Sequence, residues 1–336
     1  MSKNVALFSP AHCWGRSSNR LMETSMKAVQ IQQYGDSNVL RYVDIDEPIM
    51  NDDDVLIRVV GSSVNPVDWK IRAGHMKEMV ALPLPAILGW DVSGVVQATG
   101  KSVSTFAVGD CVYARPDIAR PGTYAELIAV RASEVAVKPT TISHIEAGVL
   151  PLAGITAWEA MVTVGEVSEG QRVLIHAASG GVGSLAVQIA KARGAYVIGT
   201  ASSRNRSLVE SLGADEFIDY HAQPFQNVAK DIDVVFDTIG GQTQEASWDT
   251  MSPGGILVSI TAPPSEETAR QHGVRSAFVY IGPNVAALDG LTNLIERGEL
   301  HPIVGAEFAL ADVGRAHLLS ESGRARGKIA LYVGQP

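Results

Sequence analysis

The sequence predicts an α/β protein in which a β-rich domain is combined with a doubly wound domain built on a parallel sheet. The length of 336 residues exceeds what one hydrophobic core usually fills, and 46% hydrophobic against 19% charged residues indicates a folded chain. The pattern also changes along the chain. Short β-rich runs occupy residues 26–136, whereas strands alternate with helices after residue 170.

Short apolar runs separated by turn residues predict the strands of the first domain. The predicted strands are 27–31, 55–60, 94–98, 111–114 and 125–130. Residues 51–54, which read Asn-Asp-Asp-Asp, and the pair Gly109-Asp110 supply reversals of the chain. The first domain is therefore expected to be an antiparallel, partly closed sheet.

Continuous apolar strands alternate with amphipathic helices in the second domain. The predicted strands are 172–176, 195–199, 233–237 and 255–260, and the predicted helices are 182–193, 204–212 and 242–251. This alternation is typical of a parallel sheet with helices on both faces, because parallel strands need crossover connections. After about residue 283 the sequence predicts a helix through Arg297, a strand at 306–308, a helix at 310–321 and a last strand at 328–333.

Charge and cysteine content limit the expected partners. The chain has 27 Lys and Arg against 36 Asp and Glu, which gives a net charge of −9, and it has no run of five or six basic residues. Nucleic acid and anionic membranes are therefore not expected as partners, and small molecules are. Gly, Pro or charge interrupts every apolar run, so no membrane span is expected. Two cysteines, Cys13 and Cys111, favour a cytoplasmic protein.

Residues 1–25 differ from the rest of the chain. They are rich in Ser, Asn and Arg, and their longest apolar run, 5–8, is too short for a secretory signal. We expect a disordered extension, or a start site that belongs at Met26. A basic organelle transit peptide is the alternative interpretation.

Residues 176–183 read His-Ala-Ala-Ser-Gly-Gly-Val-Gly, after a predicted buried strand and at the start of a predicted helix. This is the context of a dinucleotide-binding turn, in which glycines permit close approach of a pyrophosphate and the helix N-terminus attracts its charge. Ala178 stands where the motif has its first glycine. The predicted cofactor-binding residues here are Ala178, Ser179, Gly180, Gly181, Val182 and Gly183. The alternative is a tight turn without a ligand.

The end of the second predicted strand indicates which dinucleotide binds. An acidic residue there would bind the adenosine ribose hydroxyl of NAD, but no acid occurs before Glu210. Ser202, Arg204 and Arg206 stand in its place, and arginine suits the 2′-phosphate of NADPH. The sequence therefore predicts NADPH, unless both arginines only form a solvated helix start.

Seven segments together give the chain a specific resemblance to a known family. They are 26–29, 65–72, 88–96, 108–113, 177–183, 237–241 and 327–329. On these segments residues 26–336 resemble the medium-chain dehydrogenase/reductase superfamily, in its zinc-free quinone oxidoreductase branch. The resemblance implies a GroES-like catalytic domain formed by 26–145 and 284–336, with a Rossmann domain inserted at 146–283. It also implies a homodimer that forms through the Rossmann domains.

The sequence departs from the zinc-dependent branch of that superfamily. Residues 63–66 read Ser-Val-Asn-Pro where that branch has a catalytic Cys, and 89–91 read Gly-Trp-Asp where it has Gly-His-Glu. We therefore expect no metal; a scattered site using His75, His144 or Asp68 is the alternative. Without a metal to polarise an alcohol, activated acceptors such as quinones and α,β-unsaturated carbonyls are the expected substrates.

The resemblance places the segment around Asn65 at the catalytic cleft. It implies catalytic roles for Asn65, Lys70 and Asp68, with Arg72 beside them, and Trp69 and Trp90 are candidates for the acceptor pocket. Further cofactor contacts are implied for Tyr220, Thr238, Ile239, Gly240, Ser259 and Lys328. For each residue the alternative is structural: a turn, a helix cap, core packing or a solvated side chain.

The predicted function is thus NADPH-dependent transfer of hydride to a quinone or a conjugated carbonyl, with a small-molecule electron acceptor as the partner. Two alternatives remain open. One is an NADPH-binding redox sensor or crystallin-like protein with little turnover, and the other is an enoyl-thioester reductase. The sequence does not identify the substrate.

Overall fold

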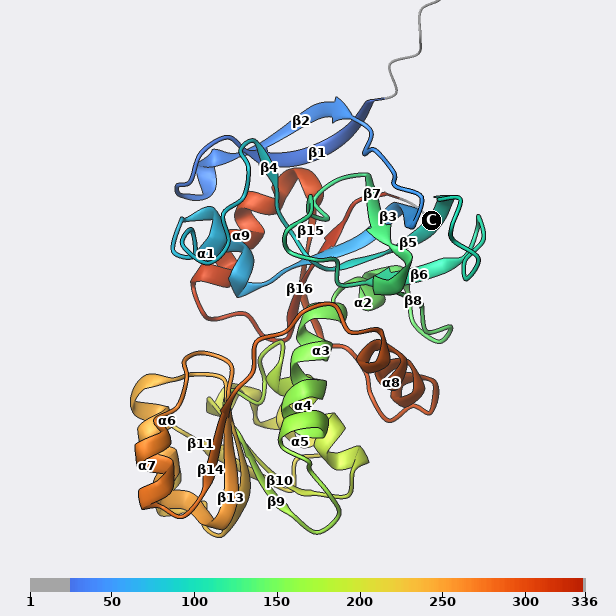
Figure 1. Cartoon of the computed structure of the whole chain (residues 1–336). Helices are drawn as coiled ribbons and strands as arrows, with labels where there is room; N and C mark the ends of the chain where they lie inside the picture. The colour runs from blue at the N-terminus through green and yellow to red at the C-terminus, as the bar shows by residue number, and fades with distance from the viewer. Residues whose placement is uncertain (1–24, 335–336) are drawn as a thin grey trace, which may run out of the picture.

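The computed structural model describes residues 25–334, which form two domains placed one above the other in Figure 1. The predictions for residues 1–24 fall outside the described residues. Within the described part of the chain, no helix has both the length and the apolar character needed to cross a membrane.

The first domain is organised around strand β3 (Asp54–Val64). This strand pairs with β5 (Val92–Thr99) on one side. On its other side it pairs with β7 (Leu127–Arg131) along its first half and with β16 (Lys328–Tyr332) along its second half. The sheet order is β15-β16-β3-β5-β6-β8, and its remaining strands are β6 (Cys111–Ala114), β8 (Val135–Val137) and β15 (Val304–Ala309). The end of the chain therefore completes the sheet that the beginning of the chain starts.

A smaller sheet and three helices complete the first domain. The sheet has the order β2-β1-β4. Its strands are β1 (Ser25–Ile31), β2 (Leu40–Asp46) and β4 (Ala86–Ile87), and the helices are α1 (Pro66–Arg72), α2 (His144–Gly148) and α9 (Val313–Glu321). Helix α1 packs against α9, so the segment around Asn65 lies beside the C-terminal part of the chain.

The second domain is a six-stranded sheet in which every pair of neighbours is parallel. Its order is β11-β10-β9-β12-β13-β14. The strands are β9 (Arg172–Ile175), β10 (Tyr196–Ala201), β11 (Glu216–Asp219), β12 (Ile232–Asp237), β13 (Met251–Ser259) and β14 (Arg275–Phe278). The order reverses between β9 and β12, and ligands bind at such a switch point in open α/β sheets.

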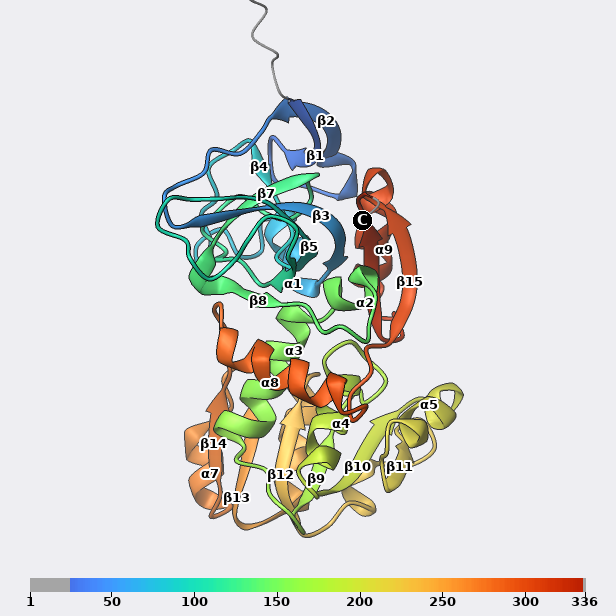
Figure 2. The ribbon, with the colours of Figure 1, turned by 90° about the vertical axis from the view of Figure 1, so that its right-hand side faces the viewer.

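Successive residues of these strands contribute to separate cores on the two faces of the sheet. Val173 and Ile175 pack with α3 (Pro151–Trp158), α4 (Gly183–Ala192), α5 (Arg206–Ser211) and α8 (Val285–Glu296). Leu174 packs in the opposite core, on the side of α6 (Gly241–Ser247) and α7 (Glu266–Gln271). Burial on both faces explains why these strands are apolar without alternation. The doubly wound fold is confirmed (Figures 1 and 2).

The structure adds elements that the sequence did not predict. Strands β2, β11 and β14 and helix α7 were not predicted. Helix α8, which the prediction placed in the first domain, contacts both α3 of the second domain and β8 of the first. The chain rejoins the first sheet at Val304, with β15.

Candidate active site

A groove of about 830 Å³ opens at the carboxyl ends of the parallel strands. We call it the strand-end groove; its lining includes His176, Ser179 and Gly180, residues 200–202, Arg204, Tyr220, Ile239 and residues 323–325. Most of these residues belong to the second domain, but 323–325 come from the loop between α9 and β16 of the first. The groove lies at the switch point of the sheet, where a dinucleotide is expected.

The turn from β9 into α4 forms one wall of this groove. Ser179 and Gly180 line the groove, whereas the Ala178 methyl group is buried beneath the turn and Val182 precedes the helix. A Cβ atom at Gly183 would lie 2.2 Å from the carbonyl oxygen of Ala177, so only glycine permits this close packing. Of the predicted residues, Ser179 and Gly180 therefore face the groove, and their neighbours shape the turn.

The structure separates the two arginines that were predicted to bind a 2′-phosphate. Arg204 and Ser202 line the strand-end groove. Arg206 points elsewhere: its guanidinium lies 3.2 Å from Glu210 and 4.4 Å from the centre of the Phe217 ring. Arg204 has no such partner among the described residues, so its positive charge is available to a ligand.

Asp237, at the end of β12, organises the next part of the groove. Its Oδ1 atom accepts hydrogen bonds from the backbone N–H groups of Ile239 (3.0 Å) and Gly240 (2.8 Å). Its Oδ2 atom accepts a hydrogen bond from Ser259 at 2.9 Å, and Thr238 donates to the carbonyl oxygen of His176 at 2.8 Å. The Ser259 and Thr238 hydroxyls are thus engaged within the protein. Ile239 presents its side chain to the groove.

His176 connects strand β10 to helix α6 beneath the groove. Its Nδ1 atom lies 3.1 Å from the Thr200 hydroxyl, and its Nε2 atom lies 3.0 Å from the Ser247 hydroxyl. Burial lowers the pKa of His176 to about 4, so its imidazole is neutral at physiological pH. Tyr220, which was predicted to flank the adenosine phosphate, lines the groove and is half exposed.

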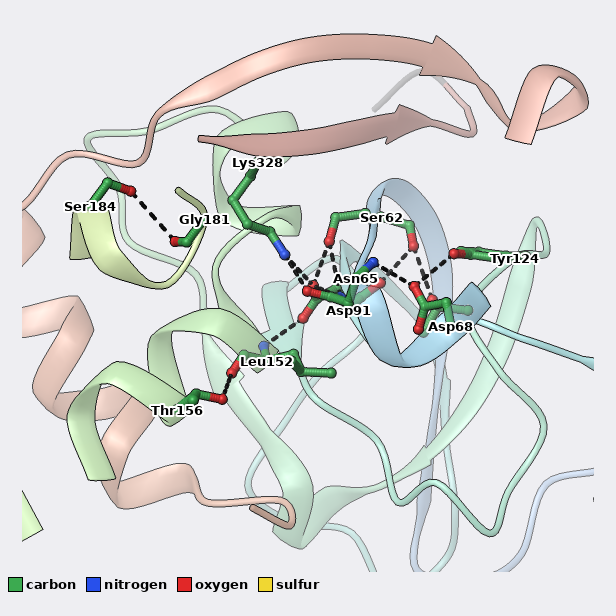
Figure 3. A network of polar contacts seen from close by, with 12 residues as sticks. Ser62, Asn65, Asp68, Asp91, Tyr124, Leu152, Thr156, Gly181, Ser184 and Lys328 are labelled. Atoms are coloured by element: carbon green, nitrogen blue, oxygen red, sulfur yellow. Dashed lines mark hydrogen bonds and ion pairs between the residues drawn. The ribbon is translucent and has the colours of Figure 1, made fainter. Parts of the chain in front are cut away.

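A buried polar cluster lies where the two domains meet (Figure 3). The ammonium of Lys328 donates to Asn65 Oδ1 and lies 3.4 Å from Asp91 Oδ2. Asn65 Nδ2 donates to the same Asp91 oxygen at 2.7 Å, and the backbone N–H of Leu152 donates to Asp91 Oδ1 at 2.6 Å. All three polar side chains are at most 5% exposed. An ammonium, a carboxamide and a carboxylate therefore form one hydrogen-bonded group.

Lys328 connects this cluster to the glycine turn. A Cβ atom at Gly181 would lie 2.8 Å from Cδ of Lys328, so the aliphatic part of the lysine packs against the turn. The preceding residue, Gly327, donates its backbone N–H to the carbonyl oxygen of Ser179 at 2.9 Å. Lys328 was predicted as a cofactor contact. In the structure its ammonium group also donates a hydrogen bond to Asn65. Asp91 was not among the predicted site residues, and its place beside Trp90 gave no signal for this role.

Asp68 lies on the inner side of α1 in a second buried network. Its Oδ2 atom accepts hydrogen bonds from the Asn65 N–H (2.7 Å) and the Tyr124 hydroxyl (2.8 Å). Tyr124 lies 3.2 Å from His317, which contacts Arg72 at 3.3 Å. Burial raises the pKa of Asp68 to about 7 and lowers that of His317 to about 3. Asp68 positions Asn65 through this contact.

The remaining predicted residues lie away from the strand-end groove. Lys70 is exposed, with its ammonium 5.9 Å from the centre of the Trp69 ring. Trp69 is partly buried and meets His75 edge to face at 5.8 Å. Trp90 is fully buried in the core of the first domain, so it has no free surface for an acceptor.

The described residues do not fit a zinc site. Within residues 25–334 no three His, Cys, Asp or Glu side chains lie close enough together to hold a metal ion. The Asp91 carboxylate already faces the Lys328 ammonium and accepts hydrogen bonds on both oxygens. His144 lies 2.8 Å from the Ser93 hydroxyl instead of joining other ligands.

The fold and the site together define a class of protein. A parallel-sheet domain carries a glycine turn for a dinucleotide, and a β-rich domain closed by its own C-terminal strands places a lysine, an asparagine and an aspartate beside that turn. This arrangement is that of a two-domain reductase or dehydrogenase with a nicotinamide cofactor.

Comparisons with known proteins identify the family. The alcohol dehydrogenase GroES-like domain family matches residues 51–140, and the zinc-binding dehydrogenase family matches residues 212–331. The chain is 32% identical to NAD(P)H oxidoreductase RTN4IP1, mitochondrial, of Danio rerio, over 92% of each chain. It is 37% identical to NADPH-dependent alkenal/one oxidoreductase, chloroplastic, of Arabidopsis thaliana, over 91% of this chain and 79% of that one.

A solved structure agrees with these sequence relatives. The quinone oxidoreductase from Coxiella burnetii superposes with a TM-score of 0.86 at 34% identity, covering 93% of this chain and 100% of that one. The chain belongs to the medium-chain dehydrogenase/reductase superfamily. The predicted family and the predicted combination of a GroES-like and a Rossmann domain are both confirmed.

Proposed function

We propose that the protein reduces quinones or α,β-unsaturated carbonyls with NADPH, at the junction between the strand-end groove and the Lys328 cluster. The contact that carries the proposal is the one made by Lys328, which packs against the glycine turn and bonds Asn65. A dinucleotide in the groove and an acceptor beside Asn65 would thus lie on the two sides of one lysine. The named activities of the relatives support the same reaction class.

When bound, the cofactor supplies a hydride from its nicotinamide ring. The acceptor oxygen then gains negative charge, which a fixed cationic donor in a buried site stabilises. Lys328 suits this role better than the predicted Lys70, because its ammonium is buried and uses two of its three N–H donors on Asn65 and Asp91. Asp91 balances the lysine charge, and the capping contact from Asp68 holds Asn65 in place.

The preference for NADPH over NADH is part of the proposal. Ser202 and the unpaired Arg204 line the groove at the end of β10, and the next acid along the chain, Glu210, is turned toward Arg206. A guanidinium binds a 2′-phosphate, whereas no Asp or Glu among the described lining residues of the groove offers a carboxylate to the ribose hydroxyl of NADH.

The test is NADPH and NADH consumption by the purified full chain with quinones, enones, short aldehydes and enoyl thioesters. We expect turnover with at least one quinone or enone, and a higher kcat/KM for NADPH. Tight NADPH binding without turnover would overturn the proposal in favour of a redox sensor or crystallin-like protein. Turnover restricted to enoyl thioesters would identify an enoyl-thioester reductase instead.

We also propose that the protein forms a homodimer through β14, an edge strand of the parallel sheet. Its unpaired side can accept the same strand of a second copy, and Phe278 and Tyr280 are 41% and 60% exposed there. Sedimentation should show a dimer that Tyr280→Lys weakens. A monomer at working concentration would overturn this proposal and leave the assigned reaction untouched.

A further inference from the structure

One wall of the strand-end groove comes from the first domain. Residues 323–325, in the loop between α9 and β16, form this wall, whereas all the other lining residues belong to the second domain. The central residue of this wall, Arg324, was not among the predicted cofactor contacts.

Contacts at both ends hold this loop in place. At its start, Glu321 is paired with the buried Arg72 of α1. At its end, Gly327 donates its backbone N–H to the carbonyl oxygen of Ser179, and the two segments form a β-bridge between Gly180 and Gly327. The backbone of Arg324 is therefore fixed close to the glycine turn.

The Arg324 side chain has no partner within the described part of the chain. Its guanidinium makes no hydrogen bond or ion pair there; only its backbone N–H is engaged, donating to the Ser322 hydroxyl oxygen at 3.2 Å. Arg324 is exposed, and it lines the same groove as Arg204. Two guanidinium groups from two domains thus face one cavity without a carboxylate to neutralise them.

The groove as a whole selects an anion. No Asp or Glu occurs among its described lining residues, although the complete chain has a net charge of −9. The lining supplies two arginines, the hydroxyl groups of Ser179 and Ser202, and the backbone of the glycine turn. These are the donors that bind phosphate oxygens.

We infer that Arg324 binds a phosphate group of the dinucleotide, so that the cofactor is held from both domains, by Arg204 on one side and Arg324 on the other. The inference rests on the proposed function, because it takes the occupant of the groove to be a phosphorylated dinucleotide. A guanidinium can bind the oxygens of either the 2′-phosphate or the diphosphate. The binding of fragments that carry one or the other distinguishes the two.

The experiment measures the binding of 2′-AMP, ADP and 2′,5′-ADP to the full chain by calorimetry, without turnover. Arg324→Gln should weaken at least one of these fragments by about tenfold to a hundredfold, the usual value of a hydrogen bond to a charged group. Arg326→Gln is the matched control, because Arg326 is exposed in the same loop but does not line the groove. It should bind every fragment as the wild type does.

Each outcome has a distinct meaning. Weaker 2′-AMP binding places Arg324 on the 2′-phosphate, and weaker ADP binding with unchanged 2′-AMP binding places it on the diphosphate. Unchanged binding of all three fragments to Arg324→Gln, at an unchanged melting temperature, overturns the inference alone. If the wild type binds none of the fragments, the proposed use of NADPH itself fails.

Discussion

The buried carboxyl group of Asp68 makes the stability of the protein depend on pH in a defined direction. Burial, the largest cause, raises its pKa from 3.8 to about 7, against the hydrogen bonds from Asn65 and Tyr124. The folded protein therefore keeps a proton that the unfolded chain releases at lower pH. The stabilisation from this group is complete below about pH 4 and is lost as the pH rises through about 7.

The size of the effect follows from the two pKa values. A difference of about three pH units corresponds to about 4 kcal/mol in the free energy of unfolding, or about 1.4 kcal/mol for each unit of pH in that interval. Asp68→Asn should remove this dependence, because a carboxamide stays neutral and can still accept the hydrogen bonds from Asn65 and Tyr124. The variant should therefore gain stability relative to the wild type as the pH rises.

Urea unfolding of both proteins at several values between about pH 4 and pH 8 checks this expectation. The other titrating groups contribute equally to both proteins, so their contributions cancel in the difference between the two free energies of unfolding. Asp54→Asn is the control: burial raises the pKa of Asp54, but hydrogen bonds from Arg120 and Asn51 outweigh it and lower the pKa below its usual 3.8. The stabilisation from Asp54 is lost only below this pH range, so the difference between Asp54→Asn and the wild type should stay constant within it. A difference between Asp68→Asn and the wild type that does not change with pH would show that Asp68 does not have a raised pKa in the folded protein.

Three further predictions concern the cofactor and the catalytic cluster. Arg204→Ala should weaken NADPH binding by about tenfold to a hundredfold and leave NADH binding unchanged, because Arg204 has no protein partner to lose; an equal loss for Arg206→Ala would contradict the separation of the two arginines. Lys328→Met should lower kcat/KM by about a hundredfold, which is the usual effect of removing one hydrogen-bond donor to a developing oxyanion. The control Lys70→Met should keep kcat/KM near the wild-type value in the same assay. Gly183→Ala should cost about 1–3 kcal/mol of stability and weaken dinucleotide binding, because its Cβ would meet the Ala177 carbonyl; normal urea unfolding would show that the turn can expand.

The parallel sheet could be predicted because its central strands are apolar on both faces and each is followed by a helix. The elements that were missed are short, or lie where that signal is weak. Strand β14 is a four-residue edge strand with no fully buried residue, and α7 has only six residues. Strand β2 is exposed or partly buried throughout, so its contribution to the small sheet left little apolar pattern.

The glycine turn of the site could be predicted from its spacing, because the motif and its context are local. The Lys328 contact could not be predicted, since it joins residues 263 positions apart that meet only because β16 pairs with β3. Arg204 and Arg206 look equivalent in the sequence, but Arg206 is the first residue of α5 and lies over Phe217. Trp90 is apolar in either role, and only the packing shows that it lies in the core.

The central claim is that the protein transfers a hydride directly from bound NADPH to a quinone or a conjugated carbonyl. Single-turnover oxidation of NADPH, compared with NADPH deuterated at both C4 positions, tests it most directly with the best acceptor of the panel. We expect oxidation that depends on the acceptor and is slower with the deuterated cofactor. Bound NADPH that every quinone and enone leaves unoxidised, or oxidation at equal rates with both cofactors, would contradict it.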